Sequence, residues 1–414
     1  MSLKVAIVCD SVPHCFHGGG GVTVYSMLCA LRNQGMEVGV VALGSSDLNG
    51  STKETDCVQH LEKTWDTSVE ILGPKQGPRG RRRWPLFHDQ FPSLQQADAV
   101  ANCLGRMRPD VVLGYHWNAL GALYGLHEFP KLGLVGDPVH LPDLFRGELN
   151  LRQRKKISFS RRFRQWLLTS PNLRVQERGM VSLLNDCDRS GAFAAHHAED
   201  LERLGAKECR YYRTPTPDSL VNASTVARGK KLKIMHIGHL KGIATLAGIE
   251  LLANEILPRL KESMPEGSWE FHLVGGFFDT MPMPLQDRLK QFKVKIRGQI
   301  SPPDDEFFSS HVVLVPTPIE LGIRVRIVTA FSFGSCVVAH VANKRGIPEL
   351  EDSKNCLLGN SGEELALACI RLLKEPKLRE GLERGARKTY ENYFSIHSAG
   401  GEVIKGLGQI ASNP

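Results

Sequence analysis

The sequence predicts an α/β protein that contains two Rossmann-like domains, each built on a parallel sheet. The chain has 414 residues, which is too long for a single average core and favours two domains of similar size. Short apolar runs rich in β-branched residues, such as Val312 to Val315, are typical of buried parallel strands. Glycine turns and helical periodicity follow several of these runs, which predicts repeated strand–helix units.

The composition is ordinary for a soluble globular protein, with 42% apolar and 23% charged residues. No apolar run reaches the roughly 18 residues of a membrane span, so we expect no segment to cross a bilayer. The N-terminal MSLKVAIVCDS resembles a strand rather than a signal peptide. Ten scattered cysteines lack C-x-x-C or metal-ligand spacing, which indicates reduced core thiols. These features predict a cytoplasmic protein.

The formal net charge of +8 is concentrated in two basic segments, 79–83 and 152–164. Such runs are often only a solvated face. They also fit attraction to an acidic acceptor or peripheral contact with an anionic membrane, with Trp84, Phe163 and Trp166 as interfacial anchors. No nucleic-acid recognition fold accompanies the charge, so we expect no nucleic-acid partner.

The first domain is expected to cover residues 1–218. It begins with a buried strand at 4–9, a glycine run ending in Gly20 and Gly21, a helix from about Thr23 to Asn33, and a strand at 37–43. Glycines before a helix let backbone N–H groups approach a ligand, although a flexible turn is the simpler interpretation. The spacing differs from the dinucleotide fingerprint G-x-G-x-x-G.

The middle of this domain alternates between irregular and periodic sequence. Residues 45–91 lose their periodicity and collect Gly, Pro and Arg, which predicts a long loop. A helix at 94–107 follows, and then a strand that ends at His116. This histidine is either a satisfied polar residue or a functional group. The strand at 132–135 ends beside Asp137, another candidate for a binding site.

The domain is expected to close with a helix at 194–204 and a proline-rich linker at 214–231. His196 and His197 fall near the start of that helix, where they either face a ligand or cap the helix.

The second domain is expected at 232–394. Its strands at 232–237, 269–274 and 294–297 each end in a glycine, and Gly238 is followed by Lys241, which adds charge for a phosphate. A helix is expected at 246–261. The acidic run 304–306 fits the first turn of a helix better than a metal site.

The stretch from His311 to Glu349 is the most informative part of the chain. The strand at 312–315 is followed by a loop, by a helix that starts at Gly322, and by another strand at 336–339. Ligands of open α/β sheets bind beyond the carboxyl ends of the strands, where this loop falls. Arg324 and Arg326 near a helix N-terminus suit a phosphate. Helices at 363–374 and 377–393 and a final helix at 395–414 complete the chain.

The stretch resembles the nucleotide-sugar site of retaining glycosyltransferases of family 4. The residues that carry this resemblance are Gly322, Arg324, Arg326, Thr329, Ala330, Gly334, Val337 and Val338. The resemblance implies the GT-B fold, with two Rossmann-like parallel sheets that face a central cleft. It also implies that the helix at 395–414 crosses back to the first domain.

The resemblance assigns roles to further residues. His116 is expected against the donor sugar, and Glu320 as an acidic partner, which makes these two the catalytic candidates. The expected donor-binding residues are Gly20, Gly21, Gly238, Lys241, Gln299, Gly322, Arg324, Arg326 and Thr329. Thr329 departs from the family, which usually has a glutamate there to hold the ribose.

The function implied is transfer of a sugar from a nucleoside diphosphate sugar to an acceptor hydroxyl, with retention and without a cofactor. The acceptor is a carbohydrate, a lipid-linked molecule or another alcohol. No D-x-D pair follows a strand, so no metal site is expected, and basic residues would neutralise the departing diphosphate. The alternatives are a nucleotide-sugar epimerase or a phosphorylase on the same fold, and a donor-binding or inactive scaffold protein.

Overall fold

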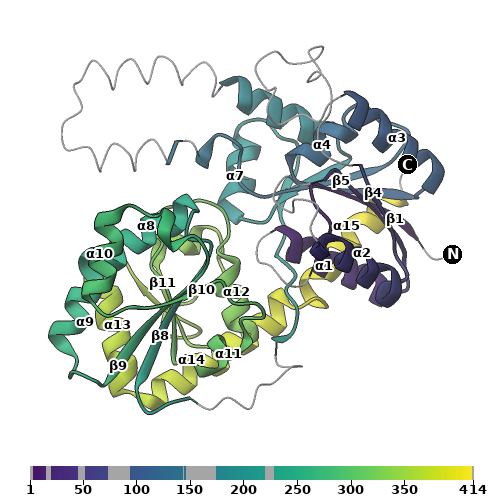
Figure 1. The fold of residues 1–414 in the computed structure, drawn as a ribbon. Helices are drawn as coiled ribbons and strands as arrows, with labels where there is room; N and C mark the ends of the chain where they lie inside the picture. The colour runs from purple at the N-terminus through teal and green to yellow at the C-terminus, as the bar shows by residue number, and fades with distance from the viewer. Residues whose placement is uncertain are drawn as a thin grey trace, which may run out of the picture. The chain divides into compact units, whose positions relative to one another are not determined.

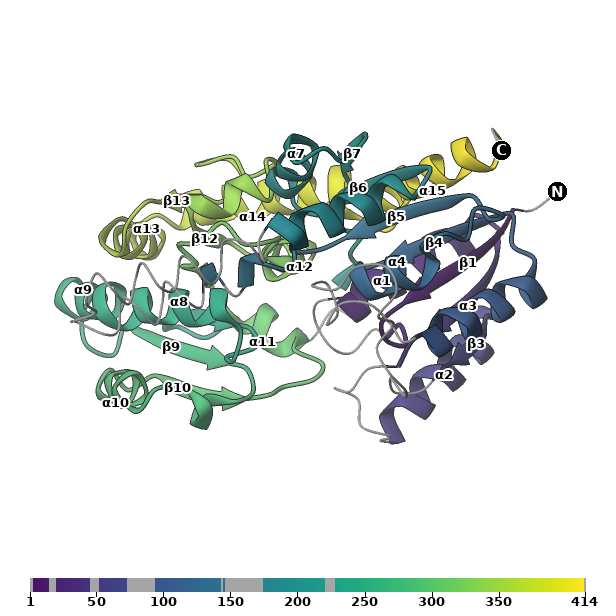
Figure 2. The same cartoon turned by 90° about the horizontal axis from the view of Figure 1, so that it is seen from above.

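The computed structural model describes residues 3–14, 20–44, 52–72, 94–142, 144–145, 174–219 and 228–412. These residues divide into two compact units. The first unit contains the described residues as far as Pro215 together with those from Ala399 onward, and the second is Thr216–Ser398. Figures 1 and 2 show that each unit is a sheet enclosed by helices. The basic segments 79–83 and 152–164 lie outside the described residues.

The sheet of the first unit has seven parallel strands in the order β3-β2-β1-β4-β5-β6-β7. The strands are β1 (Lys4–Cys9), β2 (Glu37–Ala42), β3 (Ser68–Ile71), β4 (Val111–Tyr115), β5 (Lys131–Val135), β6 (Arg189–Ala192) and β7 (Cys209–Tyr211). The accompanying helices are α1 (Gly20–Asn33), α2 (Thr52–Trp65), α3 (Leu94–Met107), α4 (Trp117–Leu123), α7 (Ala195–Arg203) and α15 (Ser398–Ala411). Helices α3 and α4 bury one face of β1, β2 and β4 in a shared apolar cluster.

The prediction of a long loop at 45–91 is wrong in part, because α2 and β3 lie within this range. Helix α2 is mostly polar, and its buried apolar residues are Cys57 and Leu61, which are spaced by four residues. Strand β3 is short and half-exposed, and it forms the edge of the sheet by pairing with β2. Both elements are stabilised by tertiary contacts more than by their own sequence pattern.

Helix α1 also begins earlier than predicted, at Gly20 instead of about Thr23. Packing explains the difference. A Cβ atom on Gly21 would lie 2.5 Å from His14 Nε2, and one on Gly20 would lie 3.2 Å from the Tyr115 hydroxyl. The two glycines therefore serve as close-packed helical residues, which only a residue without a side chain allows here.

The second unit has a six-stranded parallel sheet in the order β10-β9-β8-β11-β12-β13. Its strands are β8 (Leu232–Ile237), β9 (Trp269–Val274), β10 (Lys295–Gly298), β11 (Val312–Val315), β12 (Val337–His340) and β13 (Leu357–Gly359). One face packs on α8 (Ile243–Leu251), α9 (Leu257–Ser263), α10 (Met283–Gln291) and α13 (Gly362–Lys374). The other packs on α11 (Asp304–Ser309), α12 (Val325–Ser332) and α14 (Pro376–Thr389). Figure 1 shows these helices on the two sides of the sheet.

Two predicted helices of this unit differ in their bounds. The helix expected at 246–261 extends from Ile243 to Ser263, with a π-helical turn at Leu252–Ile256 between α8 and α9. Helix α12 starts at Val325, with Arg324 as its N-cap residue, and not at Gly322. Gly322 has a φ of +63°, so it belongs to the loop before the helix.

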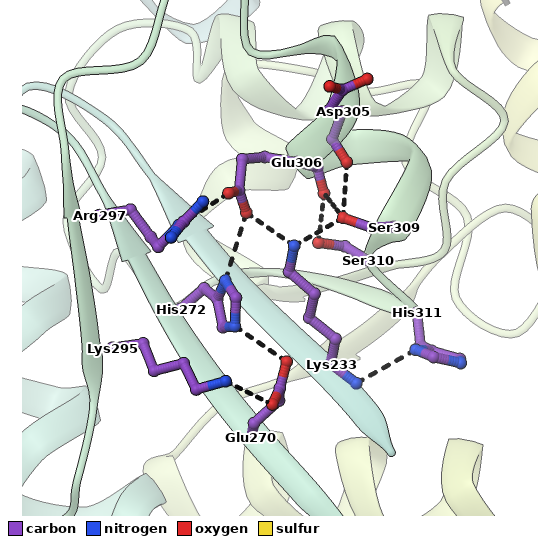
Figure 3. Close-up of polar contacts among 10 residues, drawn as sticks. All are labelled: Lys233, Glu270, His272, Lys295, Arg297, Asp305, Glu306, Ser309, Ser310 and His311. Atoms are coloured by element: carbon purple, nitrogen blue, oxygen red, sulfur yellow. Dashed lines mark hydrogen bonds and ion pairs between the residues drawn. The ribbon is translucent and has the colours of Figure 1, made fainter. Parts of the chain in front are cut away.

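The face of the second sheet that packs on α11 carries a buried ionic cluster (Figure 3). Its centre is Glu306, which accepts hydrogen bonds from Lys233 Nζ at 2.7 Å and from Arg297 Nε at 2.9 Å. His272 Nδ1 lies 3.3 Å from the same carboxylate. Burial alone would raise the pKa of Glu306, but the hydrogen bonds from Lys233 and Arg297 outweigh it and lower that pKa. The predicted acidic first turn at 304–306 is confirmed, and the carboxylate of Glu306 in this turn belongs to the buried ionic cluster.

Helix α15 packs within the first unit although it ends the chain. Its Gly400 faces Ala30 of α1, where a Cβ atom would lie 2.4 Å from the Ala30 methyl group. Gly406 lies against Tyr212, and Glu402 forms an ion pair with Arg213. Close packing by glycine thus fixes the helix on this sheet.

Candidate functional site

The carboxyl end of β8 holds the guanidinium group of Arg326. Its Nη1 donates to the Ile237 carbonyl at 2.6 Å, and its Nη2 donates to Thr245 Oγ1 at 2.8 Å. The group lies over Gly238, because a Cβ atom there would approach Nη1 to 2.4 Å. Gly238 is thus required for the arginine to reach the edge of the sheet. The structure brings these two predicted site residues together.

His236 makes the other side of this arginine site. Its Nδ1 lies 2.9 Å from the Leu314 carbonyl and its Nε2 lies 3.1 Å from Arg326 Nη1. Both contacts are hydrogen bonds when Nδ1 carries the proton and Nε2 accepts from the arginine. Burial, and then the charge of Arg326, lower the pKa of His236 to about 3. The imidazole is therefore neutral at pH 7.

The arginine site carries the positive charge of Arg326. Burial, and then repulsion by Arg324, lower the pKa of Arg326 to about 9, which leaves the guanidinium protonated at pH 7. Among the described residues, no carboxylate pairs with Arg326. A bound anion would relieve the repulsion between the two arginines, so this end of the sheet is suited to a phosphate.

Three glycine loops pack together beside the arginine site. A Cβ atom on Gly275, whose φ is +151°, would lie 1.9 Å from the Gly238 carbonyl oxygen. Gly276 lies under Gln299, whose Oε1 would be 3.3 Å from an added Cβ atom. The predicted residues Gly238 and Gln299, on the loops after β8 and β10, therefore both pack against the loop after β9 that lies between them. Exposed backbone at this edge permits close approach of a ligand.

Other predicted donor residues lie on the loop and helix after β11. Glu320 is exposed, and its carboxylate lies 3.7 Å from Arg345 Nη1. Thr329 lies in α12 and is half-buried, and its carbonyl accepts a hydrogen bond from Ser332 Oγ. The structure records Glu320 with Arg345 and not with Thr329, so these two predicted partners have different neighbours.

In the first unit, the ends of three neighbouring strands bring together Asp10, His116 and Asp137. Cys9 is in register with Tyr115, and Tyr115 with Leu134, so the residues that follow these strands share one edge. The His116 backbone has a φ of +74°, an uncommon conformation for a residue with a side chain. Its ring lies against Gly136, where a Cβ atom would approach Cε1 to 2.8 Å. Backbone strain of this kind is frequent at functional sites.

His196 and His197 extend this edge from the start of α7. His197 Nδ1 lies 3.9 Å from Asp137 Oδ1. The side chain of neither histidine caps the helix, since the N-cap residue is Ala194. His196 is buried, and neither ring nitrogen has a hydrogen-bond partner in the described structure. The interpretation of these histidines as caps is therefore wrong.

The sequence did not single out His239, Phe277 or the role of Gly136. Phe277 follows the Gly275-Gly276 pair, and an aromatic residue directly after a glycine turn was the available signal. Within the described ranges, no group of three His, Cys, Asp or Glu side chains is arranged to hold a metal ion. Nine cysteines fall in the described structure, and none of these nine forms a disulfide. No described helix is long and apolar enough to span a membrane.

Two Rossmann-like units, with a glycine-rich cationic strand edge in the second, define the GT-B class of glycosyltransferase folds. Residues 231–375 match the family model described as glycosyl transferases group 1. This segment is therefore a group 1 glycosyltransferase domain, and the predicted resemblance is confirmed. No curated protein sequence matches the chain.

Solved structures share the fold along the whole chain. HepE from Anabaena in complex with UDP has a TM-score of 0.66 at 14% identity, covering 98% of this chain and 100% of HepE. Sucrose-phosphate synthase from Thermosynechococcus elongatus has a TM-score of 0.67 at 13% identity, covering 100% of both chains. A putative UDP-N-acetylglucosamine 2-epimerase from Listeria monocytogenes has a TM-score of 0.57 at 11% identity, covering 100% of this chain and 98% of its own.

Proposed function

We propose that this protein transfers a sugar from a nucleoside diphosphate sugar to an acceptor hydroxyl. One observation carries the proposal, namely the half-buried Arg326 guanidinium at the end of β8, which lies over Gly238 and lacks a carboxylate partner among the described residues. The group 1 domain at 231–375 supports the same activity. HepE, which has the same fold, was solved with UDP.

The donor diphosphate is assigned to the edge of the second unit. Arg324 and Arg326 would pair with its phosphate oxygens, and Gly238 would let the backbone approach them. Lys241 adds a third cation from the loop after β8. Thr329 and Gln299 are the proposed contacts for the ribose and the base.

Transfer with retention and without a metal ion is part of the proposal. The three cations would stabilise the charge that develops on the departing diphosphate, which is the usual task of a metal in this chemistry. The leaving phosphate would take the proton of the acceptor hydroxyl as the new bond forms on the same face of the sugar. His116 is the proposed contact to the sugar, held in place by Gly136. Glu320 is the proposed acidic partner in catalysis.

The acceptor is proposed to be a carbohydrate, a lipid-linked molecule or another alcohol bound by the first unit, whose described parts include Gly20 and Gly21. A cytoplasmic location and contact with an anionic membrane remain proposals. The basic segments that would make this contact, 79–83 and 152–164, lie outside the described residues.

The test is calorimetric binding of UDP, GDP, TDP and ADP, followed by hydrolysis of the matching labelled sugar nucleotides. At least one diphosphate should bind, and Arg324→Ala should weaken it by roughly tenfold or more, since a charge-assisted contact contributes about 1.5–3 kcal/mol. Arg371→Ala is the matched control, because Arg371 is an exposed arginine whose ion pair in the described structure is with Glu375. Equal affinity of the wild type and Arg324→Ala would refute the assignment. Interconversion of the sugar epimers would instead favour the epimerase that the Listeria structure represents.

A further inference from the structure

Phe277 occupies an unfavourable position at the edge of the second sheet. It follows Gly275 and Gly276 after β9, and its side chain is 47% exposed. Its φ of +73° and ψ of 27° place it in the left-handed region, which large side chains rarely adopt. Exposure and backbone strain both act against a phenylalanine here, and strained residues of this kind cluster at functional sites.

Two side chains from the loop after β8 contact the Phe277 ring. The His239 ring centroid lies 4.8 Å from that of Phe277, with the planes inclined by 58°. Lys241 Nζ lies 5.1 Å from the ring centroid, within the range of a cation–π contact. The left-handed turn thus directs an aromatic ring at the neighbouring loop, whose first residue is Gly238.

The lysine has no competing ion pair in the described structure. No carboxylate lies within ion-pair distance of Lys241 among the described residues, and its contact with the Phe277 ring is its recorded interaction. A π face attracts a cation without neutralising its charge. Lys241 is therefore restrained but still able to bind an anion.

Lys241 and the half-buried Arg326 both lie beside the backbone of the loop after β8. Arg326 lies over Gly238, and Lys241 follows three residues later in the loop that precedes α8. Gly275, two residues before Phe277, packs against the Gly238 carbonyl. The loop after β8 therefore has the Arg326 guanidinium at its first residue and the Lys241 ammonium group near its end.

We infer that Phe277 is a positioning residue of the phosphate site, and that its ring holds Lys241 where the ammonium group completes the contacts to the donor diphosphate. The inference rests on the proposed function and extends it to a residue that contacts no phosphate itself. The exposed ring offers a different role, stacking of its face on the nucleobase, and the experiment separates the two roles.

Calorimetry with UDP and with inorganic pyrophosphate, a probe that has no base, tests the inference on the full-length chain. Phe277→Leu should weaken the binding of both probes by roughly two- to fivefold, the strength of an exposed cation–π contact. Lys241→Ala should weaken both at least as much. The double variant should be no weaker than Lys241→Ala, because Phe277 acts through the lysine. Phe277→Tyr, which keeps the π face, should restore the wild-type affinities.

Lys290→Ala is the matched control, since Lys290 makes a similar contact with Phe278, 5.9 Å from the ring centroid, on the α10 side of the same turn. It should leave both affinities unchanged. Additive losses in the double variant, or a loss with UDP but none with pyrophosphate, would overturn the inference in favour of base stacking. Unchanged binding by Phe277→Leu, with a wild type that binds UDP, would also reject it while the proposed function stands. A wild type that binds neither pyrophosphate nor any of UDP, GDP, TDP and ADP would refute the proposed function itself and the inference with it.

Discussion

The imidazole of His116 lies against the bare α-carbon of Gly136, across two neighbouring parallel strands. A Cβ atom on Gly136 would approach His116 Cε1 to 2.8 Å and Nε2 to 3.2 Å. The histidine reaches this position from a backbone with positive φ, as the N-cap residue directly before α4. The ring is therefore placed by its own backbone and by the absence of a side chain opposite.

Gly136→Ala should displace the His116 ring with little effect on the fold. If His116 contacts the sugar during transfer, turnover of the sugar nucleotide should fall by about 10²-fold, because small displacements of a catalytic group have effects of this size. Diphosphate affinity should not change, since Arg326 and Gly238 belong to the other unit.

The same substitution is also tested in the His116→Ala variant. Adding Gly136→Ala to that variant should cause no further loss if the glycine acts only through the histidine. Gly105→Ala in α3 is the control glycine, with open space around its added methyl group. Normal turnover in Gly136→Ala would remove His116 from the reaction.

Thr329→Glu should tighten diphosphate binding. A glutamate would accept charged hydrogen bonds from both ribose hydroxyls, each contributing about 1.5–3 kcal/mol against about 1 for a neutral one, so a gain of roughly fivefold is expected. Glu320→Gln should weaken binding if that carboxylate compensates for the threonine. A wild type that binds while neither variant changes the affinity would exclude both residues from the site. Failure of the wild type to bind any diphosphate is the outcome expected of an inactive scaffold.

His236 should make stability depend on pH. Its pKa is lowered to about 3 in the folded state, against about 6.5 in the unfolded chain, so between these values only the unfolded state takes up the proton. The free energy of unfolding should fall as the pH drops through this window, by about 1.4 kcal/mol per pH unit for this one group.

The replacement His236→Asn keeps a donor for the Leu314 carbonyl and removes the titration. Denaturant unfolding at pH 4.5 to 6.5 gives the free energy of unfolding at each pH. In this variant that free energy should change less steeply with pH, by the contribution of one proton. The control is His397→Asn, whose ring is exposed. An unchanged slope in His236→Asn would contradict the neutral state assigned to His236.

Glu306→Gln should destabilise the second unit by about 3 kcal/mol or more, because it leaves Lys233 buried without its counter-ion. Both side chains are almost completely buried, at 6% and 10% exposure. The double variant Lys233→Met/Glu306→Leu should recover much of the loss, as expected when a buried ion pair is replaced by apolar groups. Glu266→Gln, at a fully exposed pair, should change the free energy of unfolding by less than about 1 kcal/mol. If Glu306→Gln left the free energy of unfolding unchanged, the cluster in Figure 3 would not contribute to stability.

Buried strands and their glycine turns were predictable, because continuous β-branched runs such as Val312–Val315 have few alternatives in a parallel sheet. Helix α2 and strand β3 were not, since their burial depends on pairing with β2 and on two apolar residues of the helix. Local pattern is weak where tertiary contacts provide most of the stability.

The arginines of the candidate site were predictable, because they follow a strand of strongly patterned sequence. Their environment was not. The hydrogen bonds from Arg326 to Ile237 and Thr245 join residues more than 80 positions apart. The roles of Phe277 and Gly136 were also not predictable, because they depend on the residues that face them from neighbouring strands.

The placement of α15 has a consequence for how the chain is made. The second unit is formed from the continuous segment Thr216–Ser398, whereas the first unit requires residues from both ends of the sequence. On the ribosome, the second unit can assemble as soon as its last residues emerge, since domains generally fold as units during synthesis. The first unit, although most of it is translated earlier, waits for α15 to cover its surface near Ala30 and Tyr212. The half of the protein that is synthesised first is thus the half that is finished last.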